Sequence, residues 1–321
     1  MSLPKRKHLA RGAAGLAVLS GVMAMTVALL NVRGEHALPH NDAWPKAKPQ
    51  LIERGAYLAL AGNCAACHTD SARGGAAYAG GLGIETPFGT VYASNLTPDA
   101  KTGIGAWSPA HFGRALHHGR SKDGRLLYPA FPYTSYTHVT REDADAIYTY
   151  LQSLPPVERA NEPHALHFPY GTQVALAVWR ALFFAPGGLR PQPEASEEWN
   201  RGRYLVQGLG HCAACHAPRN AFGASDEGSF AGGPMPLRDW YAPSLASSAE
   251  AGLAQWKLED AVALLKTGIS PHGSTMGPMA EVVFRSTQHL SEADLAAMAS
   301  YLKDLPGVPA QPAAPPAAAA P

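Results

Sequence analysis

The first feature of the chain is a long apolar run near its amino terminus. Residues 12–32 contain no charged side chain, and basic residues precede them at Lys5, Arg6, Lys7 and Arg11. As a helix rising about 1.5 Å per residue, this run covers roughly 30 Å, which is the thickness of the hydrocarbon core of a bilayer. Because a basic flank stays in the cytoplasm, we expect the rest of the chain on the outer side of the membrane.

A cleaved secretory signal is the alternative interpretation of this segment. The apolar region of such a signal is usually about 7–15 residues long and ends in small residues. The run here is longer, and its end at residues 29–33 (Leu-Leu-Asn-Val-Arg) is a poor cleavage site. We therefore predict an uncleaved transmembrane anchor in residues 1–35. Either interpretation delivers the body of the protein to the periplasm.

The polar and apolar pattern of the remaining chain occurs twice. Residues 140–155 and 291–306 each begin with Thr or Ser, carry acidic residues in the next turn and end at a proline, as a capped helix does. Residues 53–58 and 200–205 share the pattern Arg-Gly-x-Tyr-Leu. An internal duplication is therefore predicted, in which each copy has one helix near its start and another at its end.

Between the two copies lies an apolar stretch, residues 170–184, which is predicted to be helical and is too short to span a bilayer. We interpret it as packing between domains, with contact to the membrane surface or to a partner as the alternative. Residues 36–50 contain three prolines and are expected to form an extended linker. Residues 308–321 are mostly Ala and Pro and are expected to be disordered.

Composition adds the size and the class of the protein. The chain has 321 residues, of which 46% are hydrophobic, and a formal net charge of +1, which argues against nucleic acid as a partner. Its 32 Gly and 28 Pro suit loop-rich domains. The predicted organisation is an anchor or signal (1–35), a linker (36–50), a first domain (51–156), a connector (157–199), a second domain (200–307) and a tail (308–321).

All four cysteines belong to two copies of one motif, Cys64-Ala65-Ala66-Cys67-His68 and Cys212-Ala213-Ala214-Cys215-His216. C-x-x-C-H is the attachment sequence of c-type haem, because two thiols at this spacing bond to the porphyrin vinyl groups and the adjacent imidazole ligates the iron. A zinc site is the alternative, but its two C-x-x-C pairs usually lie much closer together. We predict two covalent haem c groups. The predicted attachment residues are Cys64, Cys67, Cys212 and Cys215, and the predicted proximal ligands are His68 and His216.

The two copies differ in the residue expected on the opposite face of the iron. In the second copy Met279, in a predicted loop after Gly277 and Pro278, is the expected sixth ligand of haem 2, and Met276 is its nearby rival. At the same distance along the first copy stands Phe131, which cannot ligate iron.

The first copy contains no methionine at all, so haem 1 cannot have a methionine from its own domain. Three options follow: a histidine ligates the iron, the iron is five-coordinate behind Phe131, or another domain or subunit provides the ligand. The candidate histidines are His117, His118 and His138. Two histidine ligands would lower the potential of haem 1 below that of haem 2, so that electrons flow from haem 1 to haem 2.

With these residues in place, the chain resembles the multi-haem cytochrome c subunits of membrane-bound bacterial dehydrogenases, such as the alcohol, gluconate and fructose dehydrogenase complexes. The shared signatures are Arg-Gly-x-Tyr-Leu before each C-x-x-C-H, Ser-Asn-Leu-Thr-Pro-Asp at 94–99, Trp-Asn-Arg-Gly at 199–202 and Gly-Pro-Met-Ala-Glu at 277–281. The resemblance implies a mainly α fold of two tandem class I cytochrome c domains. Many members carry three haems and a methionine where this chain has Phe131. A two-haem form with this phenylalanine is similar to cytochromes that accompany molybdenum hydroxylases of the aldehyde or N-heterocycle type.

The resemblance also implies a function without catalysis by this chain. The protein would carry electrons from a catalytic dehydrogenase subunit, of the molybdenum or flavin/quinone type, to ubiquinone or a terminal oxidase of the respiratory chain. The implied location is the bacterial inner membrane, with the haem domains in the periplasm. A di-haem peroxidase that uses an open haem 1 is the alternative, and the missing methionine is the observation that favours it.

Overall fold

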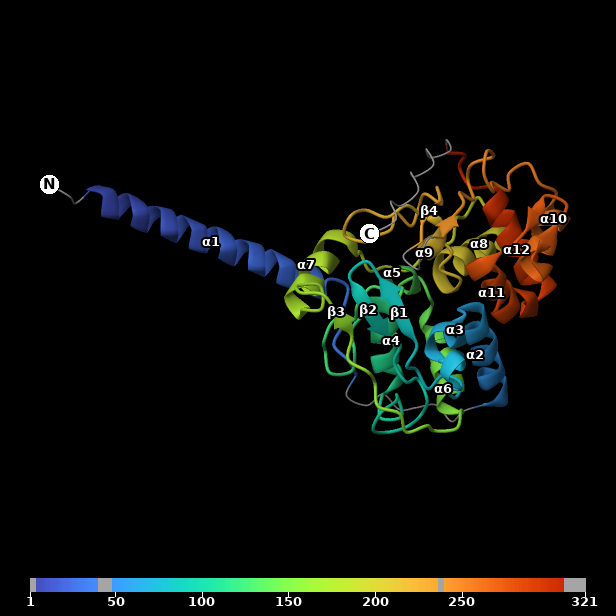
Figure 1. Ribbon diagram of the computed structural model, residues 1–321, viewed down its shortest axis with the longest axis horizontal. Coiled ribbons are helices and arrows are strands. Elements are labelled where there is room, and N and C mark those ends of the chain that lie inside the picture. Colours follow the sequence, from blue (N-terminus) through green and yellow to red (C-terminus); the bar gives the residue numbers. More distant parts are fainter. Residues whose placement is uncertain (1–3, 40–47, 236–239, 309–321) are drawn as a thin grey trace, which may run out of the picture.

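The computed structural model describes residues 4–39, 48–235 and 240–308. Helix α1 (Pro4–Val32) projects away from the rest of the molecule, with its amino-terminal end far from any other element (Figure 1). Among the described residues, Arg11–Val32 is the one stretch long and apolar enough to cross a membrane. Most of the predicted linker and nearly all of the predicted tail lie outside the described residues.

Two small helical domains follow α1 and are joined by a connector. The first domain comprises α2 (Pro49–Ala61), α3 (Cys64–His68), η1 (Ser71–Arg73), β1 (Gly83–Thr86), β2 (Gly89–Tyr92), α4 (Pro109–His118), α5 (Tyr133–Tyr136) and α6 (Arg141–Gln152). The connector holds β3 (Ala165–Leu166) and α7 (Gln173–Phe183). Helix α2 begins at Pro49, inside the range 36–50 that was predicted as linker. Proline suits this position because it is well tolerated in the first turn of a helix.

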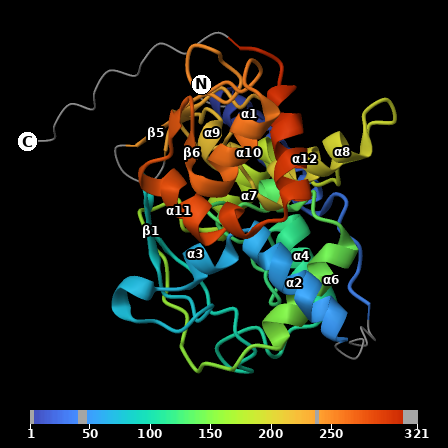
Figure 2. The same ribbon diagram turned by 90° about the vertical axis from the view of Figure 1, so that its right-hand side faces the viewer.

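The second domain repeats the order of the first. It comprises α8 (Glu197–Tyr204), the π-helical segment η2 (Leu205–Leu209), α9 (Ala213–His216), β4 (Gly233–Pro234), β5 (Tyr241–Ala242), α10 (Leu258–Thr267), β6 (Ile269–Ser270), β7 (Gly273–Ser274), α11 (Gly277–Arg285), η3 (Thr287–His289) and α12 (Glu292–Lys303). The two domains lie against each other, with α2 and α3 of the first directly beneath the second (Figure 2). Their buried apolar residues form one continuous cluster.

Short antiparallel sheets complete the fold. Strands β1, β2 and β3 form one sheet, in which Gly83 pairs with Tyr92 and Gly89 pairs with Leu166. Two further pairs, β4 with β5 and β6 with β7, lie in the second domain. The sequence did not predict these strands, because two to four residues carry too little alternation to be recognised. The sheet matters because β3 ties the connector to the first domain.

The predicted capped helices at the end of each copy are confirmed. The hydroxyl of Thr140 accepts a hydrogen bond from the backbone N–H of Asp143 at the start of α6, and Ser291 accepts one from Asp294 at the start of α12. Both caps therefore satisfy a backbone donor that the first helical turn leaves without an intrahelical partner. Both aspartates are buried, at 2% and 8% relative exposure. A buried carboxylate needs partners, and these are described below.

In each domain the first helix crosses the last helix at a glycine. A Cβ built on Gly55 of α2 would lie 1.9 Å from the carbonyl oxygen of Ala146 in α6. A Cβ on Gly202 of α8 would lie 1.9 Å from the carbonyl oxygen of Ala297 in α12. Only glycine allows the two backbones to approach this closely. The glycine of Arg-Gly-x-Tyr-Leu is thus required by the helix crossing.

We expect Gly202→Ala to destabilise the protein by at least about 1–3 kcal/mol, the usual cost of inserting a carbon into a packed core. The measurement is guanidinium unfolding of the detergent-solubilised holoprotein, followed by haem absorbance. Gly188→Ala is the matched control, since a Cβ there meets nothing within 4 Å. Equal stability of the two variants would show that α8 and α12 do not cross at this glycine.

Candidate haem sites and the interface between them

Both C-x-x-C-H motifs form a short helical turn that begins after a residue with left-handed backbone. The residue is Asn63 (φ 49°) before α3 and His211 (φ 38°) before the second motif. Positive φ is uncommon for residues other than glycine, so its recurrence at equivalent positions marks a constrained local structure. The turn brings cysteines three positions apart to one side of the helix, as attachment to one porphyrin edge requires.

The histidine of each motif is oriented through a backbone carbonyl. The Nδ1 of His68 lies 2.7 Å from the carbonyl oxygen of Ser94, and the Nδ1 of His216 lies 2.7 Å from that of Pro243. A carbonyl can only accept, so Nδ1 carries the proton and Nε2 keeps a lone pair, as the predicted ligation of iron requires. Burial lowers the pKa of both imidazoles, against the opposing effect of the carbonyl, and so favours the neutral ligating form.

The residues present fit covalent haem at both motifs. All four cysteines are free, so each pair of thiols is available for attachment. Among the described residues no three His, Cys, Asp or Glu side chains gather to hold a metal ion. When bound, each haem supplies an iron that is reversibly oxidised and reduced by one electron.

The two attachment motifs lie next to each other across the domain interface. The carbonyl oxygen of Gly62, two residues before Cys64, accepts a hydrogen bond from the hydroxyl of Tyr136 at 3.3 Å and is also bonded by His211. The ring of Tyr136 packs edge-on against that of His211, with 5.6 Å between centroids. Since His211 directly precedes Cys212, the two haem-binding turns are in contact through these residues.

A tyrosine from the first domain reaches the last helix of the second. The hydroxyl of Tyr57, in α2, donates to a carboxylate oxygen of Asp294 at 2.6 Å and accepts from the backbone N–H of Ser291 at 3.2 Å. The hydroxyl therefore sits between the N-cap residue of α12 and the third residue of that helix. Arg201 of the second domain donates to the same carboxylate at 2.8 Å.

A tyrosine from the second domain makes the same contacts in the opposite direction. The hydroxyl of Tyr204 donates to Asp143 at 2.7 Å and accepts from the backbone N–H of Thr140 at 3.2 Å, and Arg54 binds the same aspartate at 2.9 Å. In Arg-Gly-x-Tyr-Leu the arginine thus binds its own domain and the tyrosine binds the other. We call this arrangement the reciprocal tyrosine contact.

The ionised form of the aspartate is favoured in this contact. Burial alone would raise the pKa of Asp294, but the hydrogen bonds from Arg201 and Tyr57 outweigh it and lower that pKa. Burial, reinforced by the aspartate, raises the pKa of Tyr57, so this tyrosine stays a donor at neutral pH. The repeated motif was visible in the sequence, but its role in joining the domains was missed. The available signal was an acid three residues after each predicted N-cap.

The expected sixth ligand of haem 2 lies in a helix, which corrects the predicted loop. Met279 is half-buried in the first turn of α11, and its rival Met276 is 70% exposed at the N-cap position. Gly277, with a φ of 51°, and Pro278 within the first two helical positions explain the difference, because proline in a first turn starts a helix. The environment of Met279 thus separates it from Met276, and its ligation remains a prediction.

Phe131 stands just before α5 and packs against Tyr136, with 5.4 Å between ring centroids. Tyr136 is itself buried beside the thiols of the first motif, and burial, followed by the nearby Cys64 and Cys67, raises its pKa well above the usual value. The phenylalanine at the position of the missing methionine therefore belongs to an aromatic cluster next to the first attachment motif.

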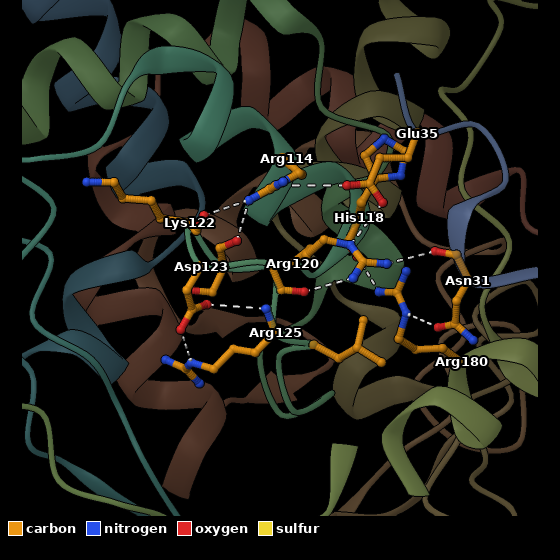
Figure 3. Close-up of polar contacts among 12 residues, drawn as sticks. Asn31, Glu35, Arg114, His118, Arg120, Lys122, Asp123, Arg125 and Arg180 are labelled. Carbon is orange, nitrogen blue, oxygen red and sulfur yellow. Dashed lines mark hydrogen bonds and ion pairs between the residues drawn. The ribbon is translucent and has the colours of Figure 1, made fainter. Parts of the chain in front are cut away.

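The three candidate histidines for haem 1 have different surroundings. His118 faces a cluster of charged residues at the base of α1 (Figure 3), where burial, with Arg180 and Arg120 nearby, lowers its pKa to about 4 despite the opposing effect of Glu35. His117 hydrogen bonds to the backbone of Val139, and the Nδ1 of His138 lies 2.7 Å from the carbonyl oxygen of Gly187. A carbonyl bonded at Nδ1 leaves Nε2 with its lone pair, as at His68, and the Nε2 of His117 is buried without a hydrogen-bond partner. A histidine ligand for haem 1 therefore stays a prediction.

Comparison with known proteins decides the family. The family model described as cytochrome c matches residues 52–155 and 200–306. The chain belongs to the cytochrome c family. The predicted mainly α fold with two tandem cytochrome c domains is confirmed, and the cytochrome carries two covalent haem c groups.

Relatives of this cytochrome include dehydrogenase subunits, which confirms the resemblance seen in the sequence. A nicotinate dehydrogenase subunit of Pseudomonas putida is 44% identical over 91% of this chain and 24% of its own. The cytochrome c subunit of the quinone alcohol dehydrogenase of Gluconacetobacter polyoxogenes is 42% identical over 83% of this chain and 58% of its own. A diheme c-type cytochrome of Cereibacter sphaeroides is 40% identical over 82% of this chain and 91% of its own. The chain thus spans less than two thirds of these dehydrogenase subunits.

We expect Tyr57→Phe to lower the stability of the cytochrome by about 1.5–3 kcal/mol, the usual range for a hydrogen bond to a charged group. The measurement is guanidinium unfolding of the holoprotein. Tyr241→Phe is the control, because Tyr241 also bonds to a carboxylate, that of Glu250 at 3.2 Å, but is 41% exposed. If both variants show the same small loss of stability, the reciprocal tyrosine contact does not stabilise the domain interface.

Proposed function

We propose that this cytochrome is an electron-transfer subunit that carries electrons from a dehydrogenase to the respiratory chain. The observation that carries the proposal is the contact between the two haem-binding turns through Gly62, Tyr136 and His211. Electron transfer falls off steeply with distance, so two haems attached side by side form one path through the protein. The names of the relatives, which are cytochrome c subunits of dehydrogenases, support the partner class.

The partner is proposed to be a dehydrogenase of the molybdenum hydroxylase type. Nicotinate, the substrate in the name of one relative, is an N-heterocycle, and Phe131 is the feature of this chain that resembles cytochromes paired with such hydroxylases. The electrons would leave to ubiquinone or to a terminal oxidase. A flavin- or quinone-dependent partner is the second candidate, since alcohol and gluconate dehydrogenase subunits are among the relatives.

We also propose that α1 is retained as an anchor in the bacterial inner membrane, with both haem domains in the periplasm. The end of α1 and the residues after it are built into the first domain (Figure 3). The backbone carbonyl of Asn31 accepts from Arg120 at 3.0 Å, and the carboxylate of Glu35 is paired with the same arginine at 2.9 Å and with Arg114 at 3.9 Å. Cleavage within this segment would remove partners from half-buried arginines.

For the irons we propose His216 and Met279 as the ligands of haem 2, and His68 as the proximal ligand of haem 1. The aromatic cluster of Phe131 and Tyr136 would then exclude water from the neighbourhood of haem 1. These residues hold and orient the cofactors, and no residue of this chain is proposed to act on an organic substrate.

The function is tested by purifying the full chain through a tag after mild detergent extraction of membranes. We expect a dehydrogenase to co-purify in stoichiometric amount, with molybdenum in the preparation. Anaerobic addition of its substrate should then reduce both haems, as followed by the α-band absorbance. Nicotinate and an aliphatic aldehyde are the first substrates to test, with ethanol and gluconate to cover the second candidate.

A lone di-haem protein that consumes hydrogen peroxide with a reduced dye as electron donor would overturn the proposal in favour of a peroxidase. A dehydrogenase that co-purifies but cannot reduce either haem with any substrate that it oxidises would also contradict it. Cys212→Ala with Cys215→Ala, which removes the attachment of haem 2, is the control that assigns each absorbance change to one haem.

Met279→Leu is expected to lower the midpoint potential of haem 2 and to open its ferrous iron to carbon monoxide, because a thioether ligand raises the potential and closes the site. Redox titration and a carbon monoxide difference spectrum measure the two effects. Met276→Leu should leave both unchanged. The reverse pattern would make Met276 the ligand. Carbon monoxide binding by the unaltered protein would show that the iron of haem 1 is open to ligands.

A further inference from the structure

Helix α7 has one face that no part of the described chain covers. Val174, Val178 and Leu182 are 75%, 42% and 68% exposed and follow one another every four residues, so they form one row along the helix. We call these residues the outer row. Exposed aliphatic side chains aligned on one helix face are typical of a surface that meets another apolar phase.

The opposite face of α7 is fixed to the body of the cytochrome. Leu176 and Arg180 are buried, the indole N–H of Trp179 donates to the carbonyl oxygen of Phe222 at 2.9 Å, and Phe183 stacks on the ring of Phe222. Arg180 is the one charged residue of α7 and points inward, to the side-chain oxygen of Asn31 at 2.9 Å. The outer row therefore has no charge beside it on its own helix.

Aromatic residues lie just before α7. Phe168 is 88% exposed, and Tyr170 is 40% exposed with its ring 4.6 Å from that of Phe88. Aromatic side chains gather at the boundary between lipid and water, where an apolar ring and a polar end are both accommodated. Phe168 and Tyr170 thus add exposed aromatic surface in the segment that leads into the helix.

The depth of α7 follows from its contact with α1. Helices α1 and α7 pack against each other at the base of the projecting helix (Figure 1). The side-chain amide of Asn31 donates to the carbonyl oxygen of Ala177 at 2.8 Å, and Val27 is half-buried one turn earlier. From Val27 to the end of α1 is about 8 Å of helix rise. Helices that lie in a membrane surface bury their apolar face by about 5–10 Å. The distance from Val27 to the end of α1 falls within this range.

We infer that the outer row and Phe168 are inserted into the outer leaflet of the bilayer that α1 crosses. This inference rests on the proposed retention of α1 as an anchor. The bilayer is the occupant because the outer row continues the apolar surface of α1 at the level where that helix leaves the membrane. A stable protein partner would need roughly 20–30 residues on this side, many more than the row and its flanking aromatics provide.

The insertion sets the orientation of the haem domains. A single transmembrane helix lets the attached domains rotate and tilt about its axis, whereas a second contact in the plane of the bilayer fixes one face toward the lipid. Because α7 is bonded to both domains, through Arg180 to the carbonyl of His118 and through Trp179 to Phe222, its insertion would fix the orientation of both domains relative to the bilayer.

The test places a spin label at Val178 in the full-length holoprotein, reconstituted in phosphatidylethanolamine–phosphatidylglycerol vesicles. In the holoprotein the four native cysteines are predicted to be bonded to haem, so the cysteine of Val178→Cys is the one thiol expected to react with the label. Collisions with oxygen, which partitions into lipid, are compared with collisions with a water-soluble nickel chelate. Val22→Cys in α1 is the lipid control and Glu259→Cys in α10 the water control, since both positions are exposed.

We expect the oxygen-to-chelate ratio at Val178 to be several-fold above that at Glu259 and to approach that at Val22. A label at Val178 that matches Glu259 while Val22 is in lipid overturns the inference and leaves the anchor intact. If Val22 also matches Glu259, both the anchor and the inference are wrong. Protection of Val178 that appears only when the dehydrogenase co-purifies would assign this face to the partner. Haem reduction by substrate, measured separately, reports the proposed function itself.

Discussion

The close crossing of first and last helices is the constraint on which the rest of the structure depends. Gly55 and Gly202 let the helix backbones touch, and only then do Tyr57 and Tyr204 reach the aspartates of the opposite domain. Each buried aspartate is held by an arginine of its own domain and a tyrosine of the other. Because these residues lie just before the haem-binding turns, the same contacts that join the domains also set the separation of the two attachment motifs.

The sequence predicted much of this arrangement, and there is a physical reason why it did not predict the rest. Thr140 and Ser291 indicated their helices, and the C-x-x-C-H motifs indicated the cofactors, because both signals are local. The exchange of tyrosines between domains joins residues far apart in the chain, which no local pattern reports. The segment around Met279 is a helix and not the expected loop. Gly277 suggested a loop in the sequence, whereas Pro278 in the first turn starts the helix.

The two domains have kept the interface and changed elsewhere. The reciprocal tyrosine contact, the glycine crossing and the carbonyl partners of His68 and His216 occur in both copies. Phe131 and Met279 occupy equivalent positions and differ. The duplication therefore preserves the scaffold that positions two haems and allows each iron its own environment, which is what a path between two unlike redox partners requires.

The reciprocal tyrosine contact also has the form of an interface between two identical subunits. In a twofold homodimer each subunit gives one patch and receives the same patch from its partner, as the two tyrosines do here. The present chain has this geometry with its two halves joined by a connector. In a homodimer every substitution appears on both sides of the interface, whereas in this chain the two halves are encoded separately, so each side is free to change on its own.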